Sequence, residues 1–146
     1  MPAPSDRPAL PPLVHKACPI VTRRGAAGAE ILVYVHPRDG LHLVRGIVPP
    51  GGDVAAAALR ELRRASGLAA RQGRGATRIV EPVPAERWHL VPCEAPGAPE
   101  QWIHAAPGPE GGELLRFRWR PLAAPPPEDA DAPVREVFAA CATAGA

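Results

Sequence analysis

Cysteine is scarce in this 146-residue chain, and its three cysteines, Cys18, Cys93 and Cys141, lie far apart in the sequence. They form no Cys-x-x-Cys pair, so the sequence excludes the common zinc-binding and disulfide-framework classes. Free thiols are the simplest interpretation, and free thiols are typical of a reducing compartment. We therefore expect a cytoplasmic protein.

Long apolar runs are also absent. No stretch approaches the roughly 20 consecutive apolar residues of a membrane-spanning helix. The first residues include Asp6 and several prolines, which interrupt the continuous apolar core that a signal peptide needs. We therefore expect no membrane partner and no export through a signal peptide.

Charge of one sign is not in large excess. The chain has 17 basic and 15 acidic residues, and a formal net charge of +2 is too small to argue for a nucleic-acid partner. Lysine is nearly missing, because Lys16 is the only one and arginine supplies the other basic residues. The length fits a single domain with a substantial core.

Nine of the 21 prolines lie in the two tails, residues 1–12 and 123–146, and suggest where the domain ends. Residues 1–12 have no periodicity and are expected to form a disordered or extended arm. Residues 13–122 are expected to form the folded domain. Residues 123–132 are expected to be a proline-rich acidic linker, and residues 133–146 a C-terminal helix and tail that pack on the same domain.

Strands are predicted from apolar runs and alternation. Residues 29–36 contain a near-continuous apolar run, which is typical of a strand buried on both faces. Residues 15–24 are predicted as a strand that Pro19 confines to an edge or a bulge, and residues 41–48 as one continuous strand. Further strands are expected at residues 77–83, 87–93, 101–106 and 114–122.

Residues 46–68 are the most informative segment, because a strand leads through a Pro/Gly loop into a helix expected at about 54–66. Asp53 is a suitable N-cap, since its carboxylate can accept hydrogen bonds from the free amides of the first turn. Gly67 suits the position after the helix, where the chain often adopts a left-handed conformation.

This segment resembles the Nudix box, in which a Gly, a Glu, an Arg-Glu-apolar core, a Glu pair and a Gly-apolar pair stand at fixed spacings. Gly46 takes the first position, Arg60-Glu61-Leu62 the core, and Gly67-Leu68 the last pair, with no gap. The resemblance implies an α+β fold, the Nudix-like α/β/α sandwich with a mixed central sheet, the loop and helix of the box, and a C-terminal helix. The predicted order of strands and helices suits that sandwich.

Three glutamates of the box are replaced. Gly52 stands in place of the first Glu, and Arg64 and Ala65 stand in place of the Glu pair. Nudix hydrolases split a diphosphate linked to another group, usually with Mg²⁺ or Mn²⁺ held by glutamates on one helix face. The resemblance therefore implies Glu61 as the remaining catalytic and metal-binding side chain, and the main-chain carbonyl of Gly46 as a further metal ligand.

Candidate substrate-binding residues lie in and beside the box. The loop amides of Gly51 and Gly52 could hold a phosphate, and Arg45, Arg60 and Arg64 carry guanidinium groups suited to bidentate phosphate binding. Each has a structural alternative. The glycines satisfy backbone geometry, and in the Nudix family the arginine of the box supports the loop–helix junction by pairing with a carboxylate.

Residues outside the box also leave alternatives open. Trp88, Trp102 and Trp119 are expected in core or edge packing, although one of them could stack on a base. A basic face alternates along the last predicted strand and is either solvated or in contact with phosphate; its members are Arg116, Arg118 and Arg120.

Two functions follow from these observations. The favoured one is a catalytically impaired or non-catalytic Nudix protein that binds a nucleotide or diphosphate-type ligand, or a protein partner. The alternative is an active diphosphate hydrolase, in which a carboxylate outside the box completes a site for Mg²⁺ or Mn²⁺. The candidates are Glu81, Glu86, Glu94, Glu100, Glu110 and Glu113. A homodimer is also compatible with the resemblance.

Overall fold

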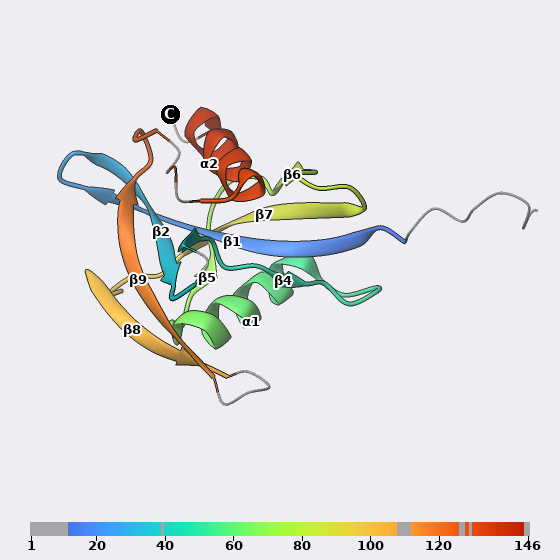
Figure 1. Ribbon diagram of the computed structural model, residues 1–146, viewed down its shortest axis with the longest axis horizontal. Coiled ribbons are helices and arrows are strands. Elements are labelled where there is room, and N and C mark those ends of the chain that lie inside the picture. The colour runs from blue at the N-terminus through green and yellow to red at the C-terminus, as the bar shows by residue number, and fades with distance from the viewer. Residues whose placement is uncertain (1–11, 39, 108–111, 126–127, 129, 145–146) are drawn as a thin grey trace, which may run out of the picture.

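The computed structural model describes residues 12–38, 40–107, 112–125, 128 and 130–144. The predicted N-terminal arm therefore lies, except for Pro12, outside the described residues. A mixed sheet has one helix on each face, and Figure 1 shows α1 (Val54–Ser66) and α2 (Ala132–Ala144) on its opposite sides. The predicted Nudix-like α/β/α sandwich is confirmed.

The main path of the sheet runs β5-β7-β1-β2-β9-β8, while β3, β4 and β6 pair with β2, β1 and β7. The β1–β7 ladder is parallel, and the other ladders of the described residues are antiparallel. The strands are β1 (Val14–Gly25), β2 (Gly28–His36), β3 (Gly40–His42), β4 (Gly46–Ile47), β5 (Arg71–Gln72), β6 (Arg78–Val80), β7 (Glu86–Glu94), β8 (Gln101–Ala106) and β9 (Glu113–Pro121).

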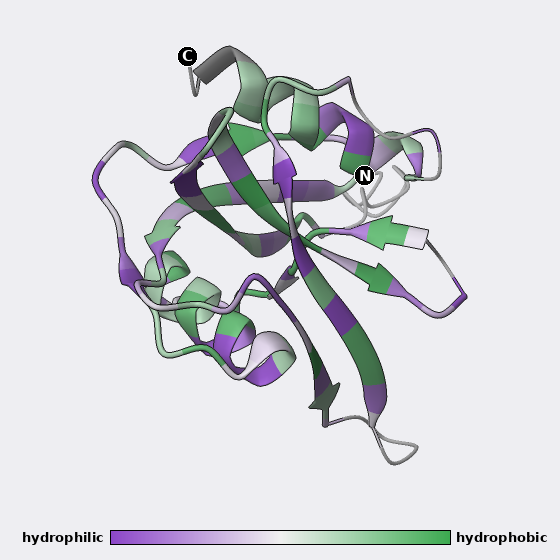
Figure 2. Cartoon of the chain, turned by 90° about the vertical axis from the view of Figure 1, so that its left-hand side faces the viewer, coloured by the Kyte–Doolittle hydropathy of each residue, from purple (hydrophilic) through white to green (hydrophobic). Residues whose placement is uncertain are grey.

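Two apolar clusters hold the helices against the sheet. The β2 strand contributes to both, because Leu32 packs in the cluster with α1 while Ile31 and Val33 pack in the cluster with α2. This confirms the prediction of a strand buried on both faces. In β9 only the α1 side is buried, so apolar and polar bands alternate along it (Figure 2), with Phe117 buried and Arg118 exposed.

Of the two positions predicted for the Pro19 strand, an edge or a bulge, the edge is wrong, because β1 lies inside the sheet between β7 and β2. On one side, Pro19 faces Val91 of β7. On the other side, the ladder to β4 ends at Ala17 and the ladder to β2 begins at Thr22. Proline is tolerated because it lies in this gap, where β1 has no second ladder to interrupt.

The prediction of one continuous strand at residues 41–48 is also wrong. The chain leaves the ladder with β2 after β3 and joins β1 only at β4. Between them, Leu43 and Val44 are buried in different clusters without belonging to a strand. Their apolar character reflects burial on the two faces of the sheet and not strand pairing. The segment between β3 and β4 leads the chain toward α1.

No helix in the described part of the chain is both long enough and apolar enough to cross a bilayer. The three cysteines are buried and unpaired. Burial raises the pKa of the Cys93 and Cys141 thiols to about 11 and also raises the pKa of Cys18. These thiols are therefore protonated at neutral pH and poorly reactive.

Candidate functional site

The α1 helix is fixed at both ends by the residues that the sequence indicates. The Asp53 carboxylate accepts hydrogen bonds from the amides of Ala55 at 2.9 Å and Ala56 at 3.4 Å. Gly67 has φ 77°, and its N–H donates to the Arg63 carbonyl at 2.8 Å. Because Asp53 serves as the N-cap, it does not replace the glutamate that is missing at the neighbouring position.

Glu61 packs against β4 at Gly46. A Cβ atom added to Gly46 would lie 2.2 Å from Cγ of Glu61, a distance at which the two atoms overlap. Glycine at this position therefore lets the Glu61 side chain lie directly on the β4 backbone. The spacing of the box thus brings Gly46 and Glu61 together, as the resemblance predicts.

Arg64 occupies the polar side of Glu61. Its Nε donates to Oε2 of Glu61 at 3.0 Å, and its Nη2 lies 2.9 Å from the same oxygen. Its Nη1 donates to the carbonyl of Pro107 at 3.1 Å. The only carboxylate on this helix face is therefore paired with a cation from the next turn.

The donors present do not fit the Mg²⁺ or Mn²⁺ site of an intact Nudix box. Such hard cations take several oxygen ligands, mainly carboxylates, whereas here Ala65 offers none and Arg64 adds a positive charge. Within the described residues, no group of three or more His, Cys, Asp or Glu side chains is placed to hold a metal.

A cleft of about 220 Å³ opens beside this ion pair. Arg45 and Arg64 both line it. The Arg45 guanidinium also lies 4.7 Å from the ring centre of Trp88, a cation–π distance. The full lining is Tyr34, Val44, Arg45, Arg64, Ala65, Ala106, Pro107, Glu113 and Leu115.

Tyr34 is a cleft residue that the sequence did not single out. Its ring stacks on His42 at 5.7 Å and packs against Phe117 at 5.4 Å, measured between ring centres. Burial raises the pKa of the Tyr34 hydroxyl. The hydroxyl therefore stays protonated at neutral pH and remains a hydrogen-bond donor at the cleft.

Of the candidate carboxylates outside the box, Glu113 lines the same cleft, and its Oε2 lies 2.8 Å from Nε2 of His36. Glu110 lies outside the described residues. Each of the other four forms an ion pair with a basic residue that does not line the cleft: Glu81 with Arg87, Glu86 with Lys16, Glu94 with Arg71, and Glu100 with Arg23.

The structure does not bring the remaining predicted residues into this cleft. Arg60 is exposed and forms no ion pair with a described residue. Gly51 and Gly52 line a different hollow, of about 600 Å³, together with His15 and His89. Of the predicted set, Arg45 and Arg64 therefore line the cleft, and Glu61 lies beside it in contact with Arg64 and Gly46. The loop glycines lie apart, and Arg60 lines neither hollow.

The loop hollow contains a histidine pair that the sequence gave no reason to expect. Nδ1 of His15 and Nε2 of His89 are 2.9 Å apart, and the ring centres are separated by 5.2 Å. Burial, followed by the proximity of His15 and Arg87, lowers the pKa of His89. The two residues are 74 positions apart, so only the parallel pairing of β1 and β7 reveals the contact.

This pair predicts a loss of stability in mild acid. The unfolded chain has a histidine pKa of about 6.5, above that of His89 in the folded state, so the unfolded state takes up protons first as the pH falls. The stabilisation is complete above about pH 6.5 and decreases below it. Urea unfolding measures the free energy of unfolding at about pH 7.5 and 5.5. Between these two pH values it should fall less in His89→Gln than in wild type.

His104→Gln, on β8 and outside this hollow, is the matched control and should retain the pH dependence of the wild type. If His89→Gln showed the same pH dependence as wild type, the loss of stability in acid could not be attributed to His89.

Comparisons with solved structures connect this architecture to known proteins. An ADP-ribose pyrophosphatase from Streptococcus suis 89-1591 is 17% identical, with a TM-score of 0.61 over 90% of each chain. A Nudix-family hydrolase from Clostridium perfringens is 8% identical, with a TM-score of 0.58 over 89% of this chain and 96% of that one. A UDP-X diphosphatase is 12% identical, with a TM-score of 0.61 over 97% of this chain and 67% of that one.

No protein-family model matches the sequence, and no characterised protein is similar enough in sequence to be matched. The structural likenesses show that the chain has the Nudix fold, as the box spacing predicts. At sequence identities this low, structural similarity establishes only the fold. The function must therefore be argued from the residues of the cleft.

Proposed function

We propose that this Nudix-fold protein binds the phosphate groups of a nucleotide or diphosphate-type ligand in the α1 cleft without a divalent metal, and that it is catalytically impaired or non-catalytic. The observation that carries the proposal is the Arg64–Glu61 ion pair. It puts a fixed positive charge where the Nudix box would gather carboxylates around metal cations. An anionic ligand can therefore meet a protein cation directly.

Arg64 retains donors for such a ligand. A guanidinium has five N–H groups, and the contacts with Glu61 and Pro107 use one on Nε and at most one on each terminal nitrogen. One N–H on Nη1 and one on Nη2 remain. These N–H groups are available as donors to phosphate oxygens.

Other polar residues line the same cleft. They are Arg45, Tyr34 with its protonated hydroxyl, and Glu113, whose carboxylate contacts His36. The cleft has a volume of about 220 Å³. The site is thus sized for phosphate groups, and the rest of a nucleotide would project into solvent.

The proposal is tested by comparing binding with turnover. Inorganic pyrophosphate, ADP-ribose, nucleotide sugars, dinucleoside polyphosphates and nucleoside triphosphates are titrated calorimetrically in EDTA, and the same panel is assayed for phosphate or nucleotide release with Mg²⁺ and Mn²⁺. We expect binding in EDTA and no release. A strict metal requirement for binding would rule the proposal out.

The alternative function, an active hydrolase, is supported by one observation: Glu113 lines the same cleft as Arg64. If a metal ion drew Glu61 away from Arg64, Glu113 would be a second carboxylate near that ion. Turnover with Mg²⁺ or Mn²⁺ that is lost in both Glu61→Gln and Glu113→Gln would establish the hydrolase instead. Glu94→Gln, whose carboxylate pairs with Arg71, is the matched control.

A further inference from the structure

A second hollow, of about 360 Å³, lies on the α2 side of the sheet. Its apolar walls include Ile20, Leu90 and Leu122, which belong to the cluster that packs around α2. The α1 cleft is instead bordered by Val44 and Leu115 of the other cluster. The sheet therefore separates the two sites, and none of the described residues lines both of them.

The α2 hollow lies beside a break in the strand pairing along β7. β5 ends opposite Cys93 and β6 begins opposite Leu90, so two residues of β7 face the five-residue segment 73–77. One of the two is Pro92, which has no N–H to donate to a ladder. The Gly73 N–H donates to the Pro92 carbonyl at 2.8 Å, and the rest of the segment leaves the sheet. The segment residues that line the hollow are Arg74, Gly75 and Ala76.

Two arginines, Arg74 and Arg78, line this hollow. Nη1 of Arg78 donates to the carbonyl of Ala140 at 2.6 Å, near the C-terminal end of α2, where a cation is favourable. Arg74 is exposed and has no ion-pair partner among the described residues, whereas Arg71 pairs with Glu94 at 2.9 Å. None of the described residues that line the hollow carries a carboxylate. An anionic group of a ligand would therefore meet Arg74 without displacing a protein carboxylate.

We infer that the α2 hollow binds a small apolar monocarboxylate, with its carboxylate at Arg74 and its hydrocarbon body against the α2 cluster. The volume of about 360 Å³ lies in the range of about 300–1,000 Å³ typical of small-molecule pockets, which combine apolar walls with few polar groups. Thr22 carries the only hydroxyl among the described lining residues. A polyphosphate would hold several charges against these walls, whereas a monocarboxylate brings one charge to the arginines and apolar carbon to Leu90 and Leu122.

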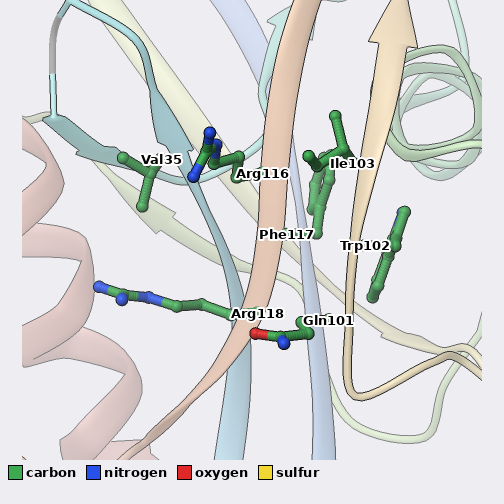
Figure 3. Close-up of a pocket in the computed structure, with 7 residues that line it drawn as sticks. All are labelled: Val35, Gln101, Trp102, Ile103, Arg116, Phe117 and Arg118. Atoms are coloured by element: carbon green, nitrogen blue, oxygen red, sulfur yellow. The ribbon is translucent and has the colours of Figure 1, made fainter.

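Another arginine on the same face of the sheet provides a matched control. In Figure 3, Arg116 and Arg118 extend from β9 toward the side of Val35. Arg118 lies opposite Val33, which packs in the α2 cluster, and it is exposed and has no ion-pair partner among the described residues. It lines a hollow at β8 and β9 and not the one at α2. Arg118→Gln therefore removes an equivalent charge without changing the inferred site.

Octanoate and octanol share a hydrocarbon chain and differ in charge, so calorimetric titration with both tests the inference. Wild type should bind octanoate at least about five-fold more tightly than octanol, and Arg74→Gln should lower only the octanoate affinity, at least about three-fold. Arg118→Gln should bind both probes as wild type does. Lengthening hexanoate to octanoate should strengthen binding by up to about four-fold per methylene group, and acetate should not bind.

Methyl NMR locates the bound octanoate. Chemical-shift changes should be confined to methyl groups of the hollow, such as those of Ile20, Leu90 and Leu122. The methyl groups of Val44 and Leu115 in the α1 cleft should stay unchanged, and saturating pyrophosphate should not displace octanoate.

Circular dichroism establishes that each variant is folded. Wild type that fails to bind octanoate below its micelle-forming concentration would overturn the inference, as would equal affinities for octanoate and octanol. An equal loss in Arg118→Gln would show attraction by general charge, and shift changes at the α1 cleft would place the ligand elsewhere; either result would also overturn it. The inference does not depend on the proposed function, because pyrophosphate binding is measured at the other cleft.

Discussion

Arg64→Glu should weaken metal-independent binding of pyrophosphate at least about ten-fold. The substitution removes the guanidinium that faces the cleft and puts a carboxylate beside Glu61. Losing a hydrogen bond to a charged group costs about 1.5–3 kcal/mol, and the new negative charge adds repulsion. We therefore expect pyrophosphate affinity in EDTA to fall at least about ten-fold, with 1.4 kcal/mol corresponding to each factor of ten.

Arg63→Glu is the matched control, because Arg63 is exposed on the same helix, has the same charge and does not line the cleft. It should bind pyrophosphate nearly as wild type does. Wild-type affinity in Arg64→Glu, or an equal loss in both variants, would show that the ligand is attracted by the general charge of the helix and not by the cleft.

Arg64→Glu should also raise the affinity of the protein for Mn²⁺. Positions 61 and 64 are three residues apart and share a helix face, so Arg64→Glu places two carboxylates where the Nudix box has them. Adding Ala65→Glu supplies a third. Mn²⁺ titration of the single and double variants should show stepwise stronger binding than wild type, and the Arg63→Glu control should show no such gain.

The ends of α1 could be predicted from the sequence because helix capping is local. Asp53 bonds to amides two and three residues ahead, and Gly67 closes onto Arg63, four residues back. The spacing of Gly46 and Glu61 likewise depends on one loop and about two turns of α1. Interactions within so short a segment can be predicted directly from the order of the residues.

The errors arose where pairing partners are distant in sequence. Pro19 excludes an interior strand only if that strand has continuous ladders on both sides. In β1 the ladder on one side is interrupted between β4 and β2, and this gap is set by the path of the whole sheet. The break between β3 and β4 has the same origin, since Leu43 and Val44 are apolar because two different layers cover them.

Several residues of the cleft could not be predicted from the sequence, because they are distant from the box along the chain. Arg64 reaches the Pro107 carbonyl 43 residues away, and Tyr34 and Glu113 come from β2 and β9. Glu113 was one of six candidate carboxylates, and nothing in the local pattern distinguishes it, or Tyr34, as a neighbour of the box helix. The loop glycines, by contrast, had a local signal that proved misleading for this cleft, because Gly51 and Gly52 line another hollow.

Gly46→Ala should destabilise the folded protein by about 1–3 kcal/mol, the usual cost of forcing extra atoms into a packed site. The added Cβ would lie 2.2 Å from Cγ of Glu61, so the Glu61 side chain must leave β4 and weaken its contact with Arg64. Chemical denaturation measures the loss as a lower midpoint at an unchanged slope.

The decisive comparison is the same substitution in a Glu61→Ala background. There the obstructing side chain is gone, and Gly46 does not have a positive φ that would disfavour alanine. Gly46→Ala should then be neutral or stabilising by up to about 1 kcal/mol, because alanine restricts the unfolded chain more than glycine does. Equal penalties in both backgrounds would mean that Gly46 is required by the β4 backbone itself. A reversal of sign would show that the glycine of the box serves in this chain to seat Glu61, and through it the Arg64 guanidinium, at the cleft.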